Sequence, residues 1–173
     1  MLKIWLYPNL LIILRRKLKQ MEFEIREIEN LSGEQAHVYS VVLEGESNSL
    51  LEQFFIENAK YKKEIKTILH KIYVMTHYDG CKRQFFKEGE GKWGDGVVAL
   101  NHTGTLRLYG IYLNRSVIIF GSGGHKPPSA RTYQDHPPLH KKAELMIDIA
   151  KEINKSIHNR ELIINNDGTL STE

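Results

Sequence analysis

Residues able to act on a phosphodiester gather in one stretch, TLRLYGIYLNRSVIIFGSGGHK, which spans residues 105–126. Arg107 and Tyr109 alternate with leucines along an expected strand, so they share one of its faces. The chain turns, returns as a second apolar strand, and leaves through glycines that deliver His125 and Lys126 together. Because antiparallel neighbours lie about 4.8 Å apart, these four side chains are expected within reach of one substrate.

The four residue types fit the cleavage of RNA without a metal or a cofactor. Arginine offers a planar fork for a phosphate and lysine a point charge, whereas histidine exchanges a proton near neutral pH and tyrosine stacks on a base. A base would activate the 2′-hydroxyl, cations would stabilise charge on the phosphate, and an acid would protonate the leaving 5′-oxygen. A structural interpretation stays open beside this one, with the strand arginine at a sheet edge and with His125 and Lys126 in water.

Other motifs with catalytic chemistry are weak in this sequence. Residues 121–126 have the glycines of a phosphate-binding loop but lack its Gly-Lys-Ser/Thr ending. His136 and His140 are four apart, but two prolines lie between them, so they do not share a regular helical face and no zinc site is predicted. The one cysteine, Cys81, is interpreted as a packing residue rather than a nucleophile.

Positive charge is concentrated in the region that holds these residues. The chain carries 24 Lys and Arg residues against 21 Asp and Glu, and residues 1–20 hold five of the 24 basic ones with no acid. Residues 102–142 carry six basic side chains and four histidines against Asp135 alone, a local field suited to a polyanion or to a solvated face. Further RNA contacts are predicted at the basic and aromatic residues Lys82, Arg83, Arg115, Arg131 and Tyr133.

The first 20 residues differ in composition from the rest. The apolar run IWLYPNLLIIL is interrupted by Pro8, is too short to span a bilayer, and precedes its basic cluster, which is the reverse of a signal peptide. Residues 1–20 are therefore interpreted as an extension with Met21 as a candidate start, and a segment lying on a membrane surface is the alternative. No stable membrane association is predicted, and a cytoplasmic location is expected because one cysteine allows no disulfide framework.

Hydrophobic periodicity predicts the elements that must position the candidate site. Alternation predicts strands over 22–26 and 37–43, and apolar residues three and four apart predict two helices, or one bent helix, over 49–77. Ser49 and Glu52 have the spacing of a capping box. Three antiparallel strands then form a meander, and a final helix begins near Leu139 with an apolar stripe.

These elements predict an α+β fold in which a small antiparallel or mixed sheet packs against an N-terminal helical hairpin, with a C-terminal helix. One domain over 21–160 is expected, followed by a tail over 161–173 with little to bury. The leucines beside Arg107 should face the helices, which leaves Arg107 and Tyr109 on the opposite face. The glycines before His125 are expected to let the backbone approach a substrate.

The order of elements resembles the RelE/ParE toxin superfamily, closest to its HigB-like, phage-derived branch. The likeness covers about residues 21–155 and rests on a strand, a helical hairpin, three strands and a polar helix. Its motifs are short, namely Val98-Ala99-Leu100-Asn101, Arg107-Leu108-Tyr109, an apolar strand, and Gly124-His125-Lys126. Asn101 stands where the family has an arginine, and Gly-Gly-His-Lys replaces its Phe-x-Lys-Lys stretch.

The resemblance implies the toxin of a type II toxin–antitoxin system, an endoribonuclease that cleaves mRNA on the ribosome and is held inactive by a small antitoxin. Arg107 and Tyr109 take the strand positions of the family, and His125 and Lys126 take its double-lysine positions, so these four are the predicted catalytic residues. Charge complementarity predicts an acidic antitoxin over residues 102–142. A hypothesis from another class is a ParE-like inhibitor that acts by protein contact, for example on gyrase, without catalysis.

Overall fold

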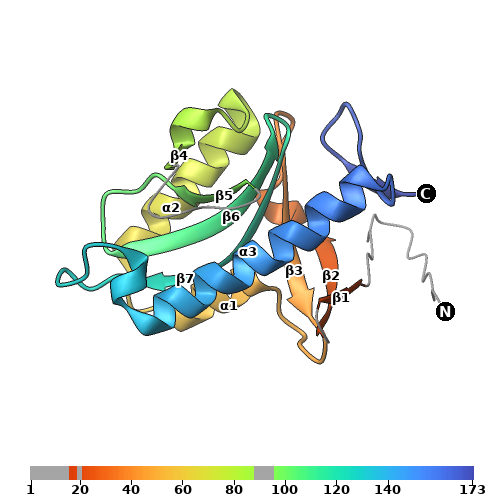
Figure 1. The fold of residues 1–173 in the computed structure, drawn as a ribbon. Coiled ribbons are helices and arrows are strands. Elements are labelled where there is room, and N and C mark those ends of the chain that lie inside the picture. Colours follow the sequence, from red (N-terminus) through yellow and green to blue (C-terminus); the bar gives the residue numbers. More distant parts are fainter. Residues whose placement is uncertain (1–15, 19–20, 88–95) are drawn as a thin grey trace.

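A seven-stranded mixed sheet forms the centre of the protein (Figure 1). A computed structural model describes residues 16–18, 21–87 and 96–173. The strands lie in the order β1-β2-β3-β7-β6-β5-β4, and β3 pairs with β7 in parallel, whereas the other pairs among the described residues are antiparallel. The strands are β1 (Arg16–Leu18), β2 (Met21–Glu27), β3 (His37–Leu43), β4 (Phe86–Lys87), β5 (Val97–Leu100), β6 (Leu106–Asn114) and β7 (Val117–His125).

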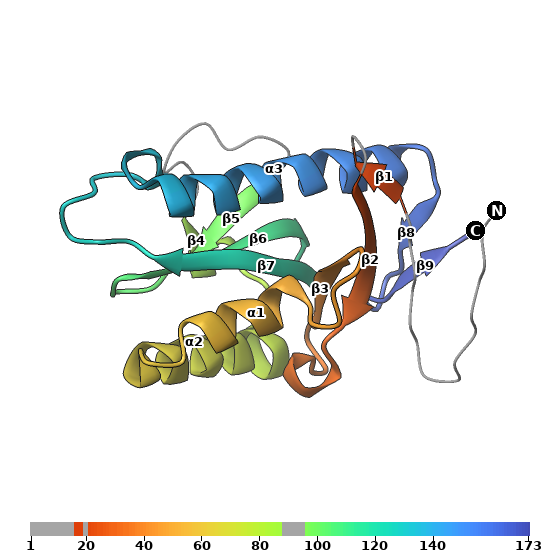
Figure 2. The same cartoon turned by 90° about the horizontal axis from the view of Figure 1, so that it is seen from below.

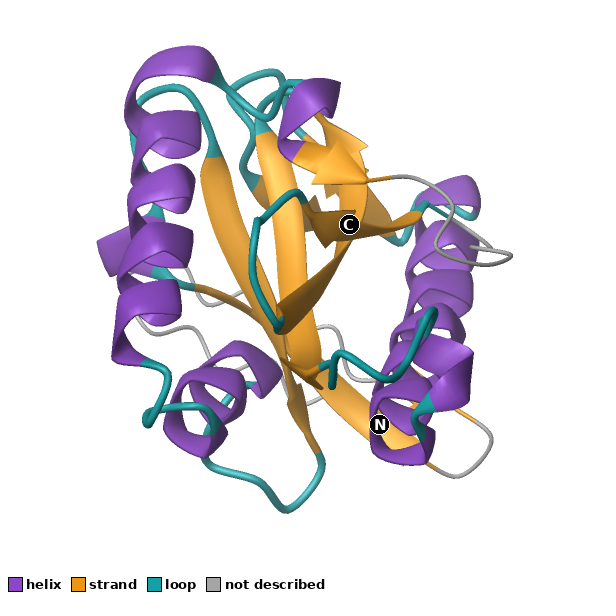
Figure 3. Ribbon diagram, turned by 90° about the vertical axis from the view of Figure 1, so that its left-hand side faces the viewer, coloured by secondary structure: helices purple, strands orange, loops and turns teal. Residues whose placement is uncertain are grey.

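Helices cover both faces of this sheet. The helices α1 (Leu50–Glu57) and α2 (Lys62–Val74) pack on one face, and α3 (Pro137–His158) crosses the other (Figure 2). Viewed from the side, the strands stand between the two helical layers (Figure 3). Short helical segments complete the chain at η1 (Glu29–Leu31), the π-helix η2 (Met75–Asp79), η3 (Arg83–Phe85) and η4 (Tyr133–Asp135).

Each face of the sheet has its own apolar core, and the sequence pattern explains both. Ile68 and Ile72 of α2 pack with Leu106 and Leu108 of β6 on one face. On the other face, buried residues three and four apart along α3 cover the sheet, namely Leu139, Ala143, Met146, Ile149, Ala150 and Ile153. The stripes predicted for these helices are therefore confirmed, and so is the capping box at Ser49 and Glu52.

The predicted fold class is wrong in its architecture, although the protein contains both helices and strands. No helix lies at the N-terminal end of the described chain, where β1, β2 and β3 come first along the sequence and join the sheet. The sheet has seven strands rather than a few, and it lies centrally between helices rather than against one helical hairpin. The parallel pairing of β3 with β7 causes the difference, because it brings β2 and β1 onto the meander's sheet.

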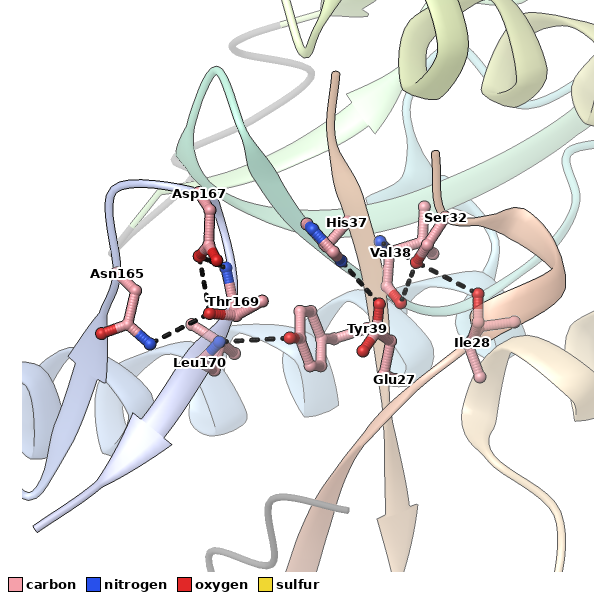
Figure 4. Close-up of polar contacts among 10 residues, drawn as sticks. All are labelled: Glu27, Ile28, Ser32, His37, Val38, Tyr39, Asn165, Asp167, Thr169 and Leu170. Atoms are coloured by element: carbon pink, nitrogen blue, oxygen red, sulfur yellow. Dashed lines mark hydrogen bonds and ion pairs between the residues drawn. The ribbon is translucent and has the colours of Figure 1, made fainter. Parts of the chain in front are cut away.

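The last residues form a hairpin rather than a tail with little to bury. Strands β8 (Leu162–Ile164) and β9 (Leu170–Thr172) pair antiparallel, and Leu162 and Leu170 are each 1% exposed within the α3-side core. The Leu170 amide donates a hydrogen bond to the Tyr39 hydroxyl over 3.1 Å, as Figure 4 shows. Burial raises the pKa of Tyr39 to about 12, although the hydrogen bond from Leu170 opposes this shift. The hairpin is thus anchored to β3, an interior strand of the sheet.

No helix in the described part of the chain is both long enough and apolar enough to cross a bilayer. The run IWLYPNLLIIL lies outside the described residues.

Candidate active site

A pocket of about 320 Å³ opens where β7 ends. Its walls come from three elements: the turn between α1 and α2, the last residues of β7, and the first turns of α3. The lining side chains that could take part in chemistry are Lys60, Tyr61, His125, His136 and Lys142. Two imidazoles and two ammonium groups thus share one hollow, which is the composition that phosphodiester cleavage by acid–base catalysis needs.

His125 is held in this pocket by an aromatic stack. It lies directly across the ladder from Leu106, and because paired residues share a face, its ring points to the α2 side of the sheet. There it stacks on Tyr61, the residue that precedes α2, with ring centroids 5.0 Å apart and planes inclined by 3°. Lys60 Nζ lies 5.1 Å from the centre of the same tyrosine ring. The ring of Tyr61 therefore orients the imidazole and places a cation beside it.

His136 reaches the pocket from the other side of the sheet's end. It is the residue before α3, in an extended conformation with φ −127°, and Pro137 and Pro138 begin the helix after it. Its Nδ1 atom is buried and has no hydrogen-bond partner among the described residues. A buried polar atom without a partner is costly in a folded protein, so this nitrogen is a candidate for binding a ligand or a water.

Two lysines bring positive charge to the pocket and its rim. Lys142 of α3 forms an ion pair with Glu57 of α1, which ties the two helices across the pocket. Lys126 follows β7, and its Nζ donates to the Arg131 carbonyl over 3.0 Å. That contact closes the loop whose end carries His136.

A carboxylate behind the pocket holds the start of β6. Glu64 of α2 accepts hydrogen bonds from the amides of Thr105 and Leu106, from the Thr105 hydroxyl and from His102, over 2.6 to 3.1 Å. Desolvation would raise the pKa of Glu64, but these bonds outweigh it and lower the pKa to about 2. Because the Lys126 amide donates to the Thr105 carbonyl over 2.7 Å, Glu64 also supports the strand end that carries His125.

Gly121 and Gly123 serve packing, contrary to the expectation that they admit a substrate, whereas Gly124 lines the pocket. A Cβ on Gly123 would lie 2.0 Å from the Arg107 carbonyl oxygen, and one on Gly121 would lie 2.2 Å from Met146 Sδ. Gly124 alone of these three leaves room, since its nearest neighbour would be Leu139 Cδ1 at 3.7 Å. Close approach of the β6 backbone therefore requires glycine at position 123, whereas at position 121 the flexible Met146 side chain would have to shift.

The structure does not bring the four predicted catalytic residues together. Tyr109 has no exposed surface and lies in the core beneath α3, so its predicted role in stacking on a base is wrong. Arg107 lies across from Gly124 on the α3 side of the sheet, the face opposite to His125. Its Nη1 donates to the carbonyls of Gly104 and Leu106 over 2.7 and 3.0 Å. His125 keeps its place in the candidate site, and Lys126 lies next to it.

The predicted RNA contacts divide between the two ends of the sheet. Arg131 is exposed in the loop after β7, and Tyr133 begins η4, with its side chain outside the described part. Lys82, Arg83 and Arg115 lie at the other end, near the turn from β6 to β7. There Lys82 pairs with Asp79 over 3.2 Å, and Arg83 lies 5.7 Å from the ring centre of Tyr112.

Sequence reasoning missed most of the pocket. Tyr61 and Lys60 lie in a turn without a recognisable motif, and the prolines after His136 exclude a shared helical face with His140, so the sequence alone predicts no site there. The signal that could have found His136 is its position before a proline pair that begins a helix. Cys81 is buried as expected, and burial raises the pKa of its thiol to about 12.

A larger hollow of about 460 Å³ lies between η1, α1 and α2 but does not suit the same chemistry. Its lining is apolar and acidic, with Phe55, Leu69 and Glu52 among its residues and Arg26 as its basic side chain. It contains no histidine. Among the described residues, no three histidine, cysteine or carboxylate groups converge as a metal centre would require, so we assign no metal ligands.

No protein family model matches this chain, and no curated protein or solved structure matches it either.

Proposed function

We propose that the protein is an endoribonuclease that cleaves RNA by acid–base catalysis, with His125 and His136 as the exchanging pair. The observation that carries this proposal is that both imidazoles line one pocket together with Lys60 and Lys142. The two histidines come from different faces of the sheet's end and meet at the same hollow, so a phosphate between them would have one on each side.

The proposed reaction balances with these groups alone. One neutral imidazole takes the proton from the 2′-hydroxyl, whose oxygen attacks phosphorus, and the bond from phosphorus to the 5′-oxygen breaks. The other imidazole, initially protonated, gives its proton to that oxygen, so the products are a 2′,3′-cyclic phosphate and a 5′-hydroxyl. Lys60 and Lys142 lie where they would stabilise the charge that grows on the phosphate.

We further propose that the enzyme is the cytoplasmic toxin of a type II toxin–antitoxin system and acts on mRNA at the ribosome. This proposal rests on the RelE/ParE resemblance of the sequence and on the two histidines in the pocket, and the strand β3 exceeds the compact pattern of that family. The proposed partner is a small acidic antitoxin over residues 102–142, whose association would weaken as salt screens the charges.

A second candidate function is a ParE-like inhibitor that acts by contact alone. One observation favours this function: Arg107 and His125 lie on opposite faces of the sheet. Two of the residues that the family resemblance predicts to be catalytic therefore cannot act on the same phosphate.

The test is cleavage of mRNA by the purified protein, with and without added ribosomes, followed by analysis of the RNA ends. His125→Ala and His136→Ala should each slow cleavage about a hundredfold, because general acid or base catalysis contributes roughly that factor. His158→Ala at the far end of α3 is the matched control and should act as the parent does. If both pocket variants fold and cleave like the parent, the proposed site is wrong. If the parent cleaves no RNA yet arrests growth with a DNA-damage response, the contact inhibitor takes its place.

A further inference from the structure

Three aromatic rings form an exposed cluster at the C-terminal end of α2, far from the pocket. Tyr73 and Tyr78 are 48% and 67% exposed, which makes them prominent among the large side chains on the surface. His77 stacks on Tyr73 with ring centroids 4.1 Å apart and planes inclined by 24°, and Tyr78 meets Tyr73 edge to face at 5.9 Å. We call Tyr73, His77 and Tyr78 the aromatic platform.

A change of helix type builds this platform. Residues five apart in an α-helix are separated by about 140° around the axis, so Tyr73 and Tyr78 would point in different directions. The π-helix η2, Met75–Asp79, closes hydrogen bonds between residues five apart and brings Tyr78 back beside Tyr73. The His77 ring is fixed there by contacts of its Nδ1 with the Thr76 hydroxyl at 2.9 Å and the Tyr73 carbonyl at 3.2 Å. The rings are thus held in place on the surface.

Basic side chains lie at Asp79, the residue that follows Tyr78, and along the exposed face of α2. Arg115 donates to the Asp79 carbonyl over 3.3 Å, and Lys82 pairs with the Asp79 carboxylate, so the nearest described acid on this segment is neutralised. The exposed face of α2 continues from Tyr73 through residues spaced three or four apart, namely His70, Lys66 and Lys63. The one acid of α2, Glu64, is turned inward to the start of β6.

We propose that the platform and the exposed face of α2 bind single-stranded RNA, with unpaired bases stacked on Tyr73 and Tyr78. This inference rests on the proposed function, because it assigns the path of the strand whose scissile phosphate lies in the pocket. Tyr61, which stacks on His125, lies 12 residues before Tyr73, about 18 Å along the helix axis. Rings held at the surface beside cations are what sequence-tolerant binding of single strands uses. A duplex would hide its bases from such rings.

The probe that tests this proposal is a labelled oligomer of 2′-deoxyuridine, which lacks the attacking hydroxyl and cannot be cleaved by the proposed reaction. Replacing both tyrosines, Tyr73→Ala with Tyr78→Ala, should weaken its binding about tenfold or more, since each stacked base contributes at least that order. The phenylalanine pair, Tyr73→Phe with Tyr78→Phe, keeps the rings and should stay within about twofold of the parent. Ile163→Ala removes an exposed apolar side chain on β8 as a remote control.

The outcomes separate this proposal from the nuclease. If the double alanine variant has the circular dichroism of the parent and binds the oligomer equally well, the platform proposal is overturned, whether or not the parent cleaves RNA. If that variant loses a protein partner and keeps the oligomer, the platform is a protein contact and the proposal is also overturned. Weakened binding by this variant, together with a parent that cleaves no RNA, supports the platform and rejects the nuclease.

Discussion

The imidazole of His125 and the phenol ring of Tyr61 lie parallel, 5.0 Å apart between centroids and inclined by 3°. They come from the end of β7 and from the turn before α2, so the stack joins the sheet to the helical layer at the mouth of the pocket. Tyr61→Ala should therefore free the imidazole to rotate and reduce cleavage about tenfold, at a cost of about 1 kcal/mol in stability. Tyr61→Phe retains the ring and should restore both quantities, which steady-state kinetics and urea unfolding can measure. Equal activity of the alanine and phenylalanine variants would show that the stack does not orient His125.

The lowered pKa of Glu64 predicts that the protein becomes less stable in acid. Its folded pKa, about 2, lies below the ordinary value of 4.5, so its stabilisation is complete above pH 4.5 and is lost as the pH falls toward 2. Glu64→Gln should lower the free energy of unfolding by about 2 kcal/mol at pH 7, because charged hydrogen bonds to Thr105 and Leu106 are lost. The difference from the parent should shrink toward pH 3. Urea titrations across this range measure it, and a gap that stays constant would contradict the role given to the carboxylate.

The raised pKa of Tyr39 predicts that the protein becomes less stable at high pH. Its folded pKa, about 12, lies above the ordinary value of 10, so its contribution is present below pH 10 and is lost as the pH rises toward 12. Tyr39→Phe leaves the buried Leu170 amide without its acceptor and should cost about 1 to 2 kcal/mol at neutral pH. Thermal melts at pH 7 and above pH 10 should show the parent approaching the variant. Hydrogen exchange at the Leu170 amide should quicken in the variant.

Neighbouring glycines predict opposite results for one substitution. Gly123→Ala places a methyl group 2.0 Å from a backbone oxygen of β6, which cannot move away as a side chain can, so the loss should be roughly 3 kcal/mol or more. Gly124→Ala meets nothing nearer than 3.7 Å and should stay within about 1 kcal/mol of the parent. Denaturant unfolding of the pair measures the contrast. Similar stabilities would show that β6 and β7 are not held so closely.

Local patterns predicted the elements of the fold, whereas long-range contacts decided its architecture. The apolar stripe of α3 and the capping box at Ser49 depend on residues within a few positions of one another, so the sequence shows them directly. The parallel pairing of β3 with β7 joins segments about 80 residues apart, and no periodicity encodes it. The alternation along β6 correctly placed Tyr109 and Leu108 on opposite faces of the sheet. It could not show that α3 covers the face that carries Tyr109.

The candidate site was only partly predictable for the same reason. The spacing along β7 identified His125, because a glycine-rich strand that ends in histidine is visible in the sequence. Its companions come from a turn and from the residue before a helix, and only the packed structure brings Tyr61 and His136 to it. The expectation that Arg107 and His125 lie within reach of one substrate was wrong, because the register pairs His125 with Leu106 and Arg107 with Gly124, which places the two side chains on opposite faces of the sheet.

The ion pair between Glu57 and Lys142 predicts that one substitution will strengthen RNA binding. Glu57 holds Lys142 at the rim of the pocket, and its side chain is 51% exposed, so a phosphate that approaches Lys142 must compete with this carboxylate. Glu57→Gln removes the competing carboxylate and should tighten binding of a non-cleavable RNA analogue a few fold. Lys142→Gln should weaken binding of that analogue to a similar extent whatever its base sequence. Binding measured at several salt concentrations adds a second readout. Loss of a phosphate contact should reduce the slope of log affinity against log salt by about 1 for Lys142→Gln, and Glu57→Gln should keep or increase that slope. If both variants weaken binding equally, the pair acts as a structural tie between α1 and α3, and Lys142 does not contact the phosphate.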